Sequence, residues 1–436
     1  MKLNIQKSIF GIVSCLALSN VFAAGTMMQA FYWDIPQGLW TKLDKQLPEL
    51  KQSGITAIWI PMPTKGAAGG YSMGYDPYDL YDFGEYDQRG SVATRFGTKA
   101  ELKKLIEDAH KINMQVYVDV VLNHMDGGNE EVINGKKLWT KFSYPHHQWE
   151  RSHHDFLDHN VSICPSCGEN SFCNDWGSRV NYTNGYNYRN LMKWADYINT
   201  EYRFDGYRFD AGKCVFPWVF VDFMKHNEGK FAVSEVYDGN VDYVKSFIHM
   251  YEGRVQLFDF PLAFMFHEMT NGKGFFDMRK LVNAGLQGVE PRYAVTFVTN
   301  HDLDRSMPIP QHKEMAYAYI MTHDGYPTVF YKDYEVYGMK KEISELTDFH
   351  NQHAHGPIKV LYADQDVYAM ARDDFILIMN DNEMTGKDIG NIQLPFRNVT
   401  LINKKLNITV QVDLNGYAVN YKLWAPKAGY AIWEIK

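Results

Sequence analysis

The sequence predicts an α/β protein built on a closed (β/α)8 TIM barrel. An inserted domain is expected after the third strand, and a C-terminal antiparallel β-sandwich domain after the barrel. Three observations predict this fold. Eight short apolar segments alternate with helical segments, which is the strand count of a closed barrel. Charged or imidazole side chains directly follow several of these segments, as they do around barrel active sites. The alternation is interrupted once and ends near residue 350.

The expected strands are identified by their apolar, β-branched composition and by the turn residues that bound them. Between the second and third strands, residues 98–113 carry apolar side chains at helical spacing, and Thr98 and Glu101 form a capping box at the start. The strands are expected at residues 27–32, 55–60, 115–121, 206–210, 231–236, 255–260, 294–299 and 327–331.

Two regions depart from the alternating pattern. Residues 124–184 lack helical periodicity and are too long for a simple loop, so an inserted domain is expected there. Beyond residue 350, alternating segments separated by turn residues indicate an antiparallel β domain over residues 351–436. The barrel is then expected to comprise residues 24–123 and 185–350.

The N-terminus has the pattern of a secretory signal peptide over residues 1–23. Lys2 and Lys7 supply the positive charge, residues 9–18 the short apolar segment, and Val21-Phe22-Ala23 the cleavage site. The apolar segment is too short to span a membrane. We therefore expect a secreted protein, either extracellular or periplasmic.

The composition is that of a soluble globular enzyme, with 22% charged and 45% hydrophobic residues. The formal net charge is −8 and no basic patch is present, which argues against a nucleic-acid partner. Aromatic residues make up 15% of the chain. Stacking on sugar rings and a large aromatic core explain that content equally well.

Four cysteines remain after removal of the signal peptide: Cys164, Cys167, Cys173 and Cys214. An even count in an exported chain favours disulfides. The alternative is a zinc site that combines Cys164 or Cys167 with His153 or His154, although only one CxxC pair is present. The histidines of this region are expected mostly at the surface of the insert: His146, His147, His153, His154 and His159.

Carboxylates follow three of the expected strands, as Asp210, Glu235 and Asp302. Retaining glycoside hydrolysis needs one ionised carboxylate as nucleophile and one protonated carboxyl as acid. Arg208 lies two residues before Asp210, so both side chains share a strand face and the arginine should keep Asp210 ionised. Glu235 has no cation next to it in the sequence and is the expected acid. Asp119, in mid-strand, is expected to anchor the barrel interior.

Four motifs resemble, in order and spacing, the four sequence regions of the α-amylase family. The resemblance covers essentially the whole mature chain, including the insert and the C-terminal β domain. The motifs are DVVLNH (119–124), GYRFDAGK (206–213), SEVYD (234–238) and FVTNHD (297–302).

The resemblance implies endo-hydrolysis of α-1,4-glucosidic bonds in starch, glycogen or maltooligosaccharides, with retention of configuration. The protein is expected to be a monomer. It implies Asp210 as nucleophile, Glu235 as acid/base and Asp302 as the carboxylate that steadies the transition state. It also implies substrate contacts from Tyr75, His124, Arg208, Lys213 and His301.

The resemblance further implies a Ca²⁺ cofactor that pins the insert to the barrel. The expected ligands are Asn123, Asp175 and the backbone carbonyl of Cys214. Two departures affect this site. The family's Lys-His pair is Lys213-Cys214 here, and its Pro-Asp-x-Asp-like ligand segment is Ser178-Arg179-Val180-Asn181. Because Cys214 stands where the family places a residue facing the insert, a disulfide from Cys214 to the 164–173 loop is also expected.

Other functions remain open at this point. A member of the same family could act only on short maltooligosaccharides or transfer glucosyl chains. A non-catalytic polysaccharide-binding protein would be indicated by loss of one of the three carboxylates, and all three are present.

Overall fold

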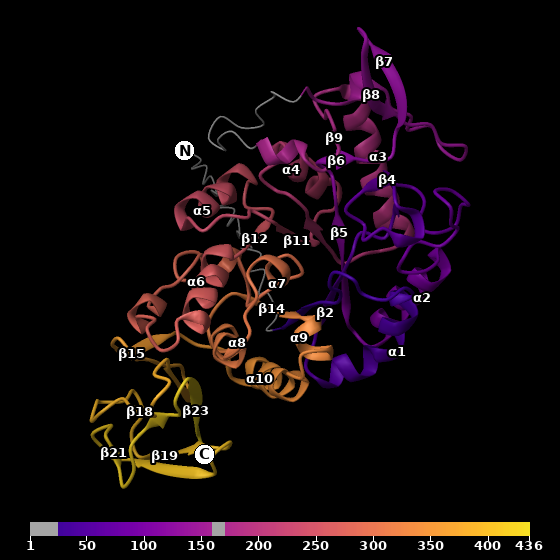
Figure 1. The fold of residues 1–436 in the computed structure, drawn as a ribbon. Coiled ribbons are helices and arrows are strands. Elements are labelled where there is room, and N and C mark those ends of the chain that lie inside the picture. The colour runs from indigo at the N-terminus through magenta and orange to yellow at the C-terminus, as the bar shows by residue number, and fades with distance from the viewer. Residues whose placement is uncertain (1–24, 159–170) are drawn as a thin grey trace, which may run out of the picture.

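The computed structural model describes residues 25–158 and 171–436 (Figure 1). The expected signal peptide, His159, Cys164 and Cys167 lie outside the described residues. Within them, no helix is long and apolar enough to cross a membrane.

Eight parallel strands close into the expected barrel, in the order β1-β14-β13-β12-β11-β10-β5-β2. Several strands end one to three residues before their predicted limits, because the chain leaves the ladder where the polar side chains begin. Asp210 and Glu235 each directly follow the last residue of a strand. The strands are β1 (Met27–Gln29), β2 (Ala57–Ile60), β5 (Gln115–Val120), β10 (Gly206–Phe209), β11 (Phe231–Ser234), β12 (Gln256–Phe258), β13 (Ala294–Phe297) and β14 (Tyr326–Phe330).

The helices that follow the strands bury their apolar sides against the barrel. Helix α2 begins with the predicted capping box between Thr98 and Glu101. Helix α3 begins at Gly185, because the Asn184 side chain accepts a hydrogen bond from the backbone N–H of Tyr186. The helices are α1 (Leu39–Gln52), α2 (Lys99–Lys111), α3 (Gly185–Glu201), α4 (Pro217–His226), α5 (Val241–Met250), α6 (Phe260–Asn271), α7 (Leu303–Ser306), α8 (Lys313–Thr322), α9 (Tyr331–Glu335) and α10 (Lys340–His353).

The insert lies between β5 and α3, at one end of the barrel (Figure 1). It contains two small antiparallel pairs, β6 with β9 and β7 with β8. A further short pair, β3 with β4, lies in the loop after β2. These elements are β3 (Lys65–Gly66), β4 (Pro77–Asp79), β6 (His124–Met125), β7 (Asn129–Ile133), β8 (Lys136–Lys141) and β9 (Ser178–Arg179), with 3-10 turns η1 (Gly69–Tyr71), η2 (His153–Asp155) and η3 (Ser171–Asn174).

Two histidines of the insert are not at the surface, contrary to prediction. The His146 and His147 side chains are 10% and 13% exposed, because both rings pack on the fully buried carboxylate of Asp79. Nε2 of His146 lies 2.7 Å from Asp79 Oδ2, and Nε2 of His147 lies 2.8 Å from Oδ1. These contacts fasten the insert to the loop after β2, a long-range pairing that the local sequence does not reveal.

The C-terminal domain is the predicted antiparallel module, a seven-stranded sheet with a two-stranded companion (β18 with β22). Strands β16 and β17 are buried on both faces. One face, with Met370 and Leu377, joins the barrel core, and the other, with Ala369 and Ile376, packs inside the domain. The strands are β15 (Lys359–Ala363), β16 (Val367–Ala371), β17 (Phe375–Asn380), β18 (Lys387–Asp388), β19 (Val399–Asn403), β20 (Ile408–Val412), β21 (Ala418–Val419), β22 (Trp424–Ala425) and β23 (Gly429–Ile435), and the loops before β13 hold η4 (Met278–Leu281) and η5 (Pro291–Tyr293).

A buried histidine at the contact between barrel and C-terminal sheet predicts acid sensitivity. Burial lowers the pKa of His323 to about 3, and its ring nitrogens lie 2.9 Å from the Tyr319 carbonyl oxygen and 2.8 Å from the Tyr368 hydroxyl. The unfolded state therefore binds one more proton than the folded state between pH 6.5 and 3, so folding stability falls as the pH falls. His323→Gln should flatten the plot of unfolding free energy against pH by about 1.4 kcal/mol per pH unit. Denaturant melts at pH 6, 5 and 4 measure this slope. The exposed His154 provides the control, since His154→Gln should leave the slope unchanged.

Candidate active site

A cavity of about 510 Å³ opens at the carboxyl ends of the barrel strands. It gathers every predicted catalytic carboxylate and most of the predicted substrate contacts. Its walls come from the loops after the strands and from the insert. The lining residues are Trp33, Tyr75, His124, Trp176, Asp210, Ala211, Lys213, Cys214, Glu235, Tyr237, His301 and Asp302.

The Arg208 guanidinium lies at the base of this site and is 1% exposed. Its Nη1 donates to Asp119 Oδ1 at 2.9 Å and to Asp210 Oδ1 at 2.7 Å. Its Nη2 lies 2.9 Å from Glu235 Oε2. The expected anchoring role of Asp119 is confirmed by this contact and by the Tyr75 hydroxyl, which donates to Asp119 Oδ2 at 2.8 Å. Although no cation adjoins Glu235 in the sequence, the pairing of β10 with β11 brings Arg208 beside it.

Three carboxylates thus share one guanidinium, which changes the expected electrostatics. Burial raises the pKa of Asp210 well above its usual range, and Glu235 and Asp119 add to the rise while Arg208 opposes it. Arg208 therefore does not by itself keep Asp210 ionised. The group of Asp119, Asp210 and Glu235 carries more negative charge than its single cation balances, which favours retention of a proton within it. Glycoside hydrolysis needs that proton on the acid.

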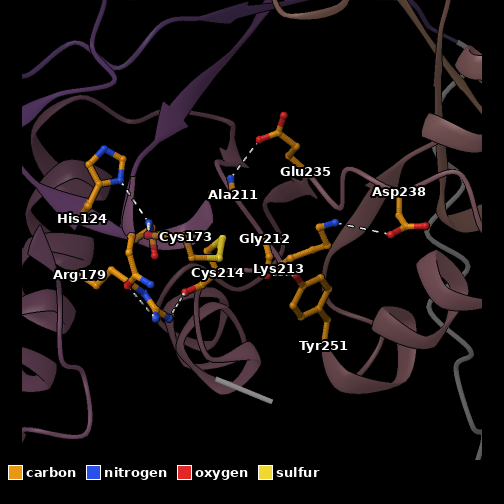
Figure 2. Close-up of a disulfide and its surroundings, with 12 residues drawn as sticks. His124, Cys173, Arg179, Ala211, Gly212, Lys213, Cys214, Glu235, Asp238 and Tyr251 are labelled. Carbon is orange, nitrogen blue, oxygen red and sulfur yellow. Dashed lines mark hydrogen bonds and ion pairs between the residues drawn. A yellow bond between two sulfur atoms is a disulfide. The ribbon is translucent and has the colours of Figure 1, made fainter. Parts of the chain in front are cut away.

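The Glu235 carboxylate is oriented by a strained turn after β10. Ala211 has a φ of 49°, in the left-handed region that residues with a side chain seldom adopt. This conformation directs the Ala211 N–H to Glu235 Oε2, at 3.0 Å (Figure 2). Backbone strain of this kind is characteristic of functional sites.

Asp302 lies in a different environment from the other two carboxylates. Burial acts to raise its pKa, but the neighbouring His301 and a hydrogen bond from Trp33 lower the pKa below its usual value. Trp33 Nε1 donates to Asp302 Oδ1 at 3.0 Å, and His301 Nε2 lies 3.4 Å from Oδ2. The surroundings of Asp302 thus favour the ionised form more than those of Asp210 do.

The predicted sugar-binding side chains adjoin these carboxylates. The Tyr75 ring stacks on His301 with centroids 5.2 Å apart. His124 Nε2 lies 2.9 Å from the Tyr75 carbonyl oxygen. Burial lowers the pKa of both His124 and His301, so both rings are neutral hydrogen-bonding groups near pH 7. Lys213 lies at the other side of the cavity, 3.5 Å from Asp238.

Three aromatic residues of the cavity were not predicted: Trp33, Trp176 and Tyr237. Trp176 and Tyr237 are 42% and 38% exposed, so their rings are accessible to a ligand. Tyr237 lies within the SEVYD motif and Trp33 just beyond the first strand, so strand-end position was an available signal for both. Trp176 comes from the insert, where no periodic pattern could place it.

A disulfide joins Cys173 of the insert to Cys214 beyond β10 (Figure 2). The expected link from Cys214 to the 164–173 loop is thereby confirmed, with Cys173 as its partner. Since Cys164 and Cys167 lie outside the described residues, their pairing stays a prediction. The Cys214 end of the bridge lines the cavity, directly after Lys213 in the sequence.

Removal of this disulfide should destabilise the protein. The bridge spans a sequence separation of 41 residues, and closing a loop of that length is worth about 2–4 kcal/mol. Cys173→Ser with Cys214→Ser should lower the free energy of unfolding by that amount, measured by denaturant melts. A double variant as stable as the unchanged protein would show that the bridge contributes no stability.

The Cys214 carbonyl, one of the oxygens expected to bind calcium, faces a cationic side chain instead. The Cys214 carbonyl accepts from Arg179 Nη2 at 3.3 Å, and the Asn174 side-chain oxygen accepts from Arg179 Nη1 at 3.4 Å. Asn123 turns its amide N–H to the Cys173 carbonyl at 3.0 Å, and the Asp175 side chain is exposed. A guanidinium on the expected ligand carbonyl repels a divalent cation, so this donor set does not fit calcium.

One other group could hold a metal ion. Across residues 25–158 and 171–436, Asp79, His146 and His147 form the one group of at least three His, Cys, Asp or Glu residues whose ligand atoms lie close enough together. Two imidazoles and one carboxylate suit zinc or another transition metal better than calcium.

Comparisons with known proteins identify the family of this chain. A family model described as the catalytic domain of alpha amylase matches residues 21–219. The chain is 33% identical to an alpha-amylase of Geobacillus stearothermophilus over 76% of this chain and 71% of that protein. It is 32% identical to a cytoplasmic alpha-amylase of Escherichia coli (strain K12) over 73% and 75%. Among solved structures, an alpha-amylase from Malbranchea cinnamomea is similar in fold, with a TM-score of 0.74 and 15% identity over 94% of this chain and 96% of that one. Relatives this similar over most of their own length show that the chain belongs to the α-amylase family of glycoside hydrolases.

Proposed function

We propose that this protein is an endo-acting α-amylase that hydrolyses internal α-1,4-glucosidic bonds in starch, glycogen and maltooligosaccharides with retention of configuration. The observation that carries the proposal is the pairing of Asp210 and Glu235 on the two amino nitrogens of one guanidinium, with Asp302 in the same cavity. Retaining hydrolysis requires two carboxyl groups close enough for direct attack, with no water between nucleophile and sugar.

The proposed reaction proceeds in two displacements. Asp210 attacks the anomeric carbon while Glu235 donates its proton to the departing glycosidic oxygen, which leaves a glycosyl ester on Asp210. Glu235, now ionised, removes a proton from a water molecule, and the hydroxide attacks the same carbon and releases Asp210. The sugar product carries the original anomeric configuration, and both carboxyl groups return to their starting states.

The remaining side chains are proposed to hold the sugar at the cleavage position. Asp302, ionised because of His301 and Trp33, accepts hydrogen bonds from sugar hydroxyls and favours the positive charge of the transition state. Tyr75 supplies a ring face, and neutral His124 and His301 supply hydrogen bonds. Lys213 is proposed to contact the aglycone side of the substrate, which is the part of the glucan chain that departs.

Export is also proposed, on the basis of the signal-like residues 1–23. Sequencing the N-terminus of the protein recovered outside the cytoplasm should find a start just after Ala23. An intact Met1 on the active protein would contradict export by this route.

Digestion of a blocked maltoheptaoside, with products followed by NMR, tests the activity. Internal cleavage should release α-anomers first, and mutarotation should then convert them to the equilibrium mixture. β-anomers at the earliest times would contradict the retaining mechanism. Hydrolysis of short maltooligosaccharides without hydrolysis of starch would favour the oligosaccharide-specific alternative. Products longer than the substrate would favour the transferring alternative.

A further inference from the structure

Arg179 lies at the junction between the insert and the barrel. It ends β9, which pairs with β6 directly after the third barrel strand, with Arg179 opposite His124. Backbone bonds hold it on both sides: its carbonyl accepts from Leu157 N at 2.7 Å, and the next residue donates to the Asn123 carbonyl at 2.9 Å. Arg179 is 4% exposed.

The Arg179 side chain connects the two parts of the protein. Its guanidinium donates to Asn174 in the insert and to the Cys214 carbonyl beyond β10, at the positions measured above (Figure 2). The same carbonyl is the one the family resemblance assigned to calcium, and Arg179 belongs to the segment that departs from the family's carboxylate ligands. We propose that the Arg179 guanidinium takes the place of the junction calcium ion, so that this enzyme keeps its insert in position without calcium.

Among residues 25–158 and 171–436, the junction supplies oxygen acceptors for an arginine and no group of carboxylates for calcium. Calcium takes six to eight oxygen ligands, several of them carboxylates. The junction offers carbonyl and amide oxygens, which accept hydrogen bonds from a guanidinium's rigid set of donors. Asn123 Oδ1 is buried and accepts no hydrogen bond from the residues at 25–158 and 171–436. A single neutral amide oxygen does not by itself make a calcium site.

The Cys173–Cys214 disulfide crosses the same junction. Asn123 donates a hydrogen bond to the Cys173 carbonyl, and Arg179 donates one to the Cys214 carbonyl. Each end of the disulfide is therefore also held by a side-chain hydrogen bond. In this proposal the disulfide and the buried Arg179 guanidinium together join the insert to the barrel, the role that the family resemblance assigns to a calcium ion.

The first test compares the melting temperature of the full-length protein in a calcium-selective chelator and in added calcium chloride. We expect the two temperatures to agree, with starch hydrolysis equally unchanged. A structural ion that binds only the folded state would raise the melting temperature with concentration. Melting that shifts with calcium, or calcium at one ion per chain after dialysis, would overturn the proposal. Calcium is the probe because the Asp79, His146 and His147 group favours transition metals.

The second test restores a carboxylate to the junction. Arg179→Asp should lower the melting temperature in chelator, and calcium should recover part of the loss, because the new carboxylate joins the Cys214 carbonyl and Asn123 Oδ1 as an oxygen ligand. An unchanged melting temperature in chelator would overturn the joining role of Arg179. A loss that calcium does not recover would overturn its equivalence to the ion.

Arg151 provides the matched control. It is also a buried arginine of the insert, 3% exposed, and its guanidinium stacks on Trp149 at 3.9 Å. Arg151→Asp should lower the melting temperature without any recovery by calcium. Equal recovery in both variants would mean that calcium acts elsewhere, which would contradict the proposal. If Arg179→Asp fails to fold, the comparison on the unchanged protein still decides the outcome.

Discussion

Asp210→Asn and Glu235→Gln are each expected to reduce starch hydrolysis on the order of 10²–10⁴-fold while leaving the fold intact. An amide at position 210 cannot form the glycosyl ester, and an amide at position 235 has no acidic proton for the leaving oxygen. The measurement is the initial rate of reducing-sugar release. Retention of more than a few per cent of the original rate by either variant would reject its assigned role.

A substrate with a good leaving group separates the two roles. The fluoride ion of a maltosyl fluoride departs without protonation by an acid. Glu235→Gln should therefore recover much of its glycosylation rate on this substrate, whereas Asp210→Asn should not. Equal impairment of both variants on the fluoride would contradict the division into acid and nucleophile. Asp242→Asn, an exposed carboxylate on α5 outside the cavity, is the control and should be fully active.

Much of this site could be predicted because its residues are adjacent in sequence to barrel strands. A strand carries its polar residue to the same end of the barrel as every other strand, so Asp210, Glu235 and Asp302 had to converge once eight strands were recognised. The prediction of eight strands was correct although several predicted strand ends were one to three residues too late. The active-site cluster therefore follows from topology alone.

The contacts between those residues could not be predicted in the same way. Arg208 meets Glu235 because β10 pairs with β11, with Arg208 opposite Val233, and the sequence gives no register. Asp79 meets His146 and His147 across more than sixty positions of chain for the same reason. Side-chain geometry between distant segments also decided that Arg179 would face the Cys214 carbonyl, although its departure from the family pattern was visible.

Arg208→Met should lower both activity and stability. The variant leaves Asp119, Asp210 and Glu235 buried together without their cation, and breaking a buried ion pair in this way typically costs about 3–5 kcal/mol. The cost should depend on pH. Burial already raises the pKa of Asp119 and Asp210, and loss of the guanidinium removes the main charge that opposes this rise, so the folded state binds more protons than the unfolded state and its stability falls as the pH rises. The deficit of the variant should therefore be largest at pH 8 and shrink toward pH 5.

Arg372→Met supplies the comparison that isolates this effect. Arg372 is 5% exposed, but it meets one carboxylate, the 42%-exposed Asp324 at 2.7 Å, and it also donates hydrogen bonds to three backbone carbonyls. Removal of Arg372 leaves no group of buried carboxylates without a cation. The loss of stability in Arg372→Met should therefore be nearly constant between pH 5 and 8. Denaturant melts of both variants across that range measure the difference. If the Arg208→Met deficit is equally constant, the three carboxylates do not depend on the shared guanidinium for their charge.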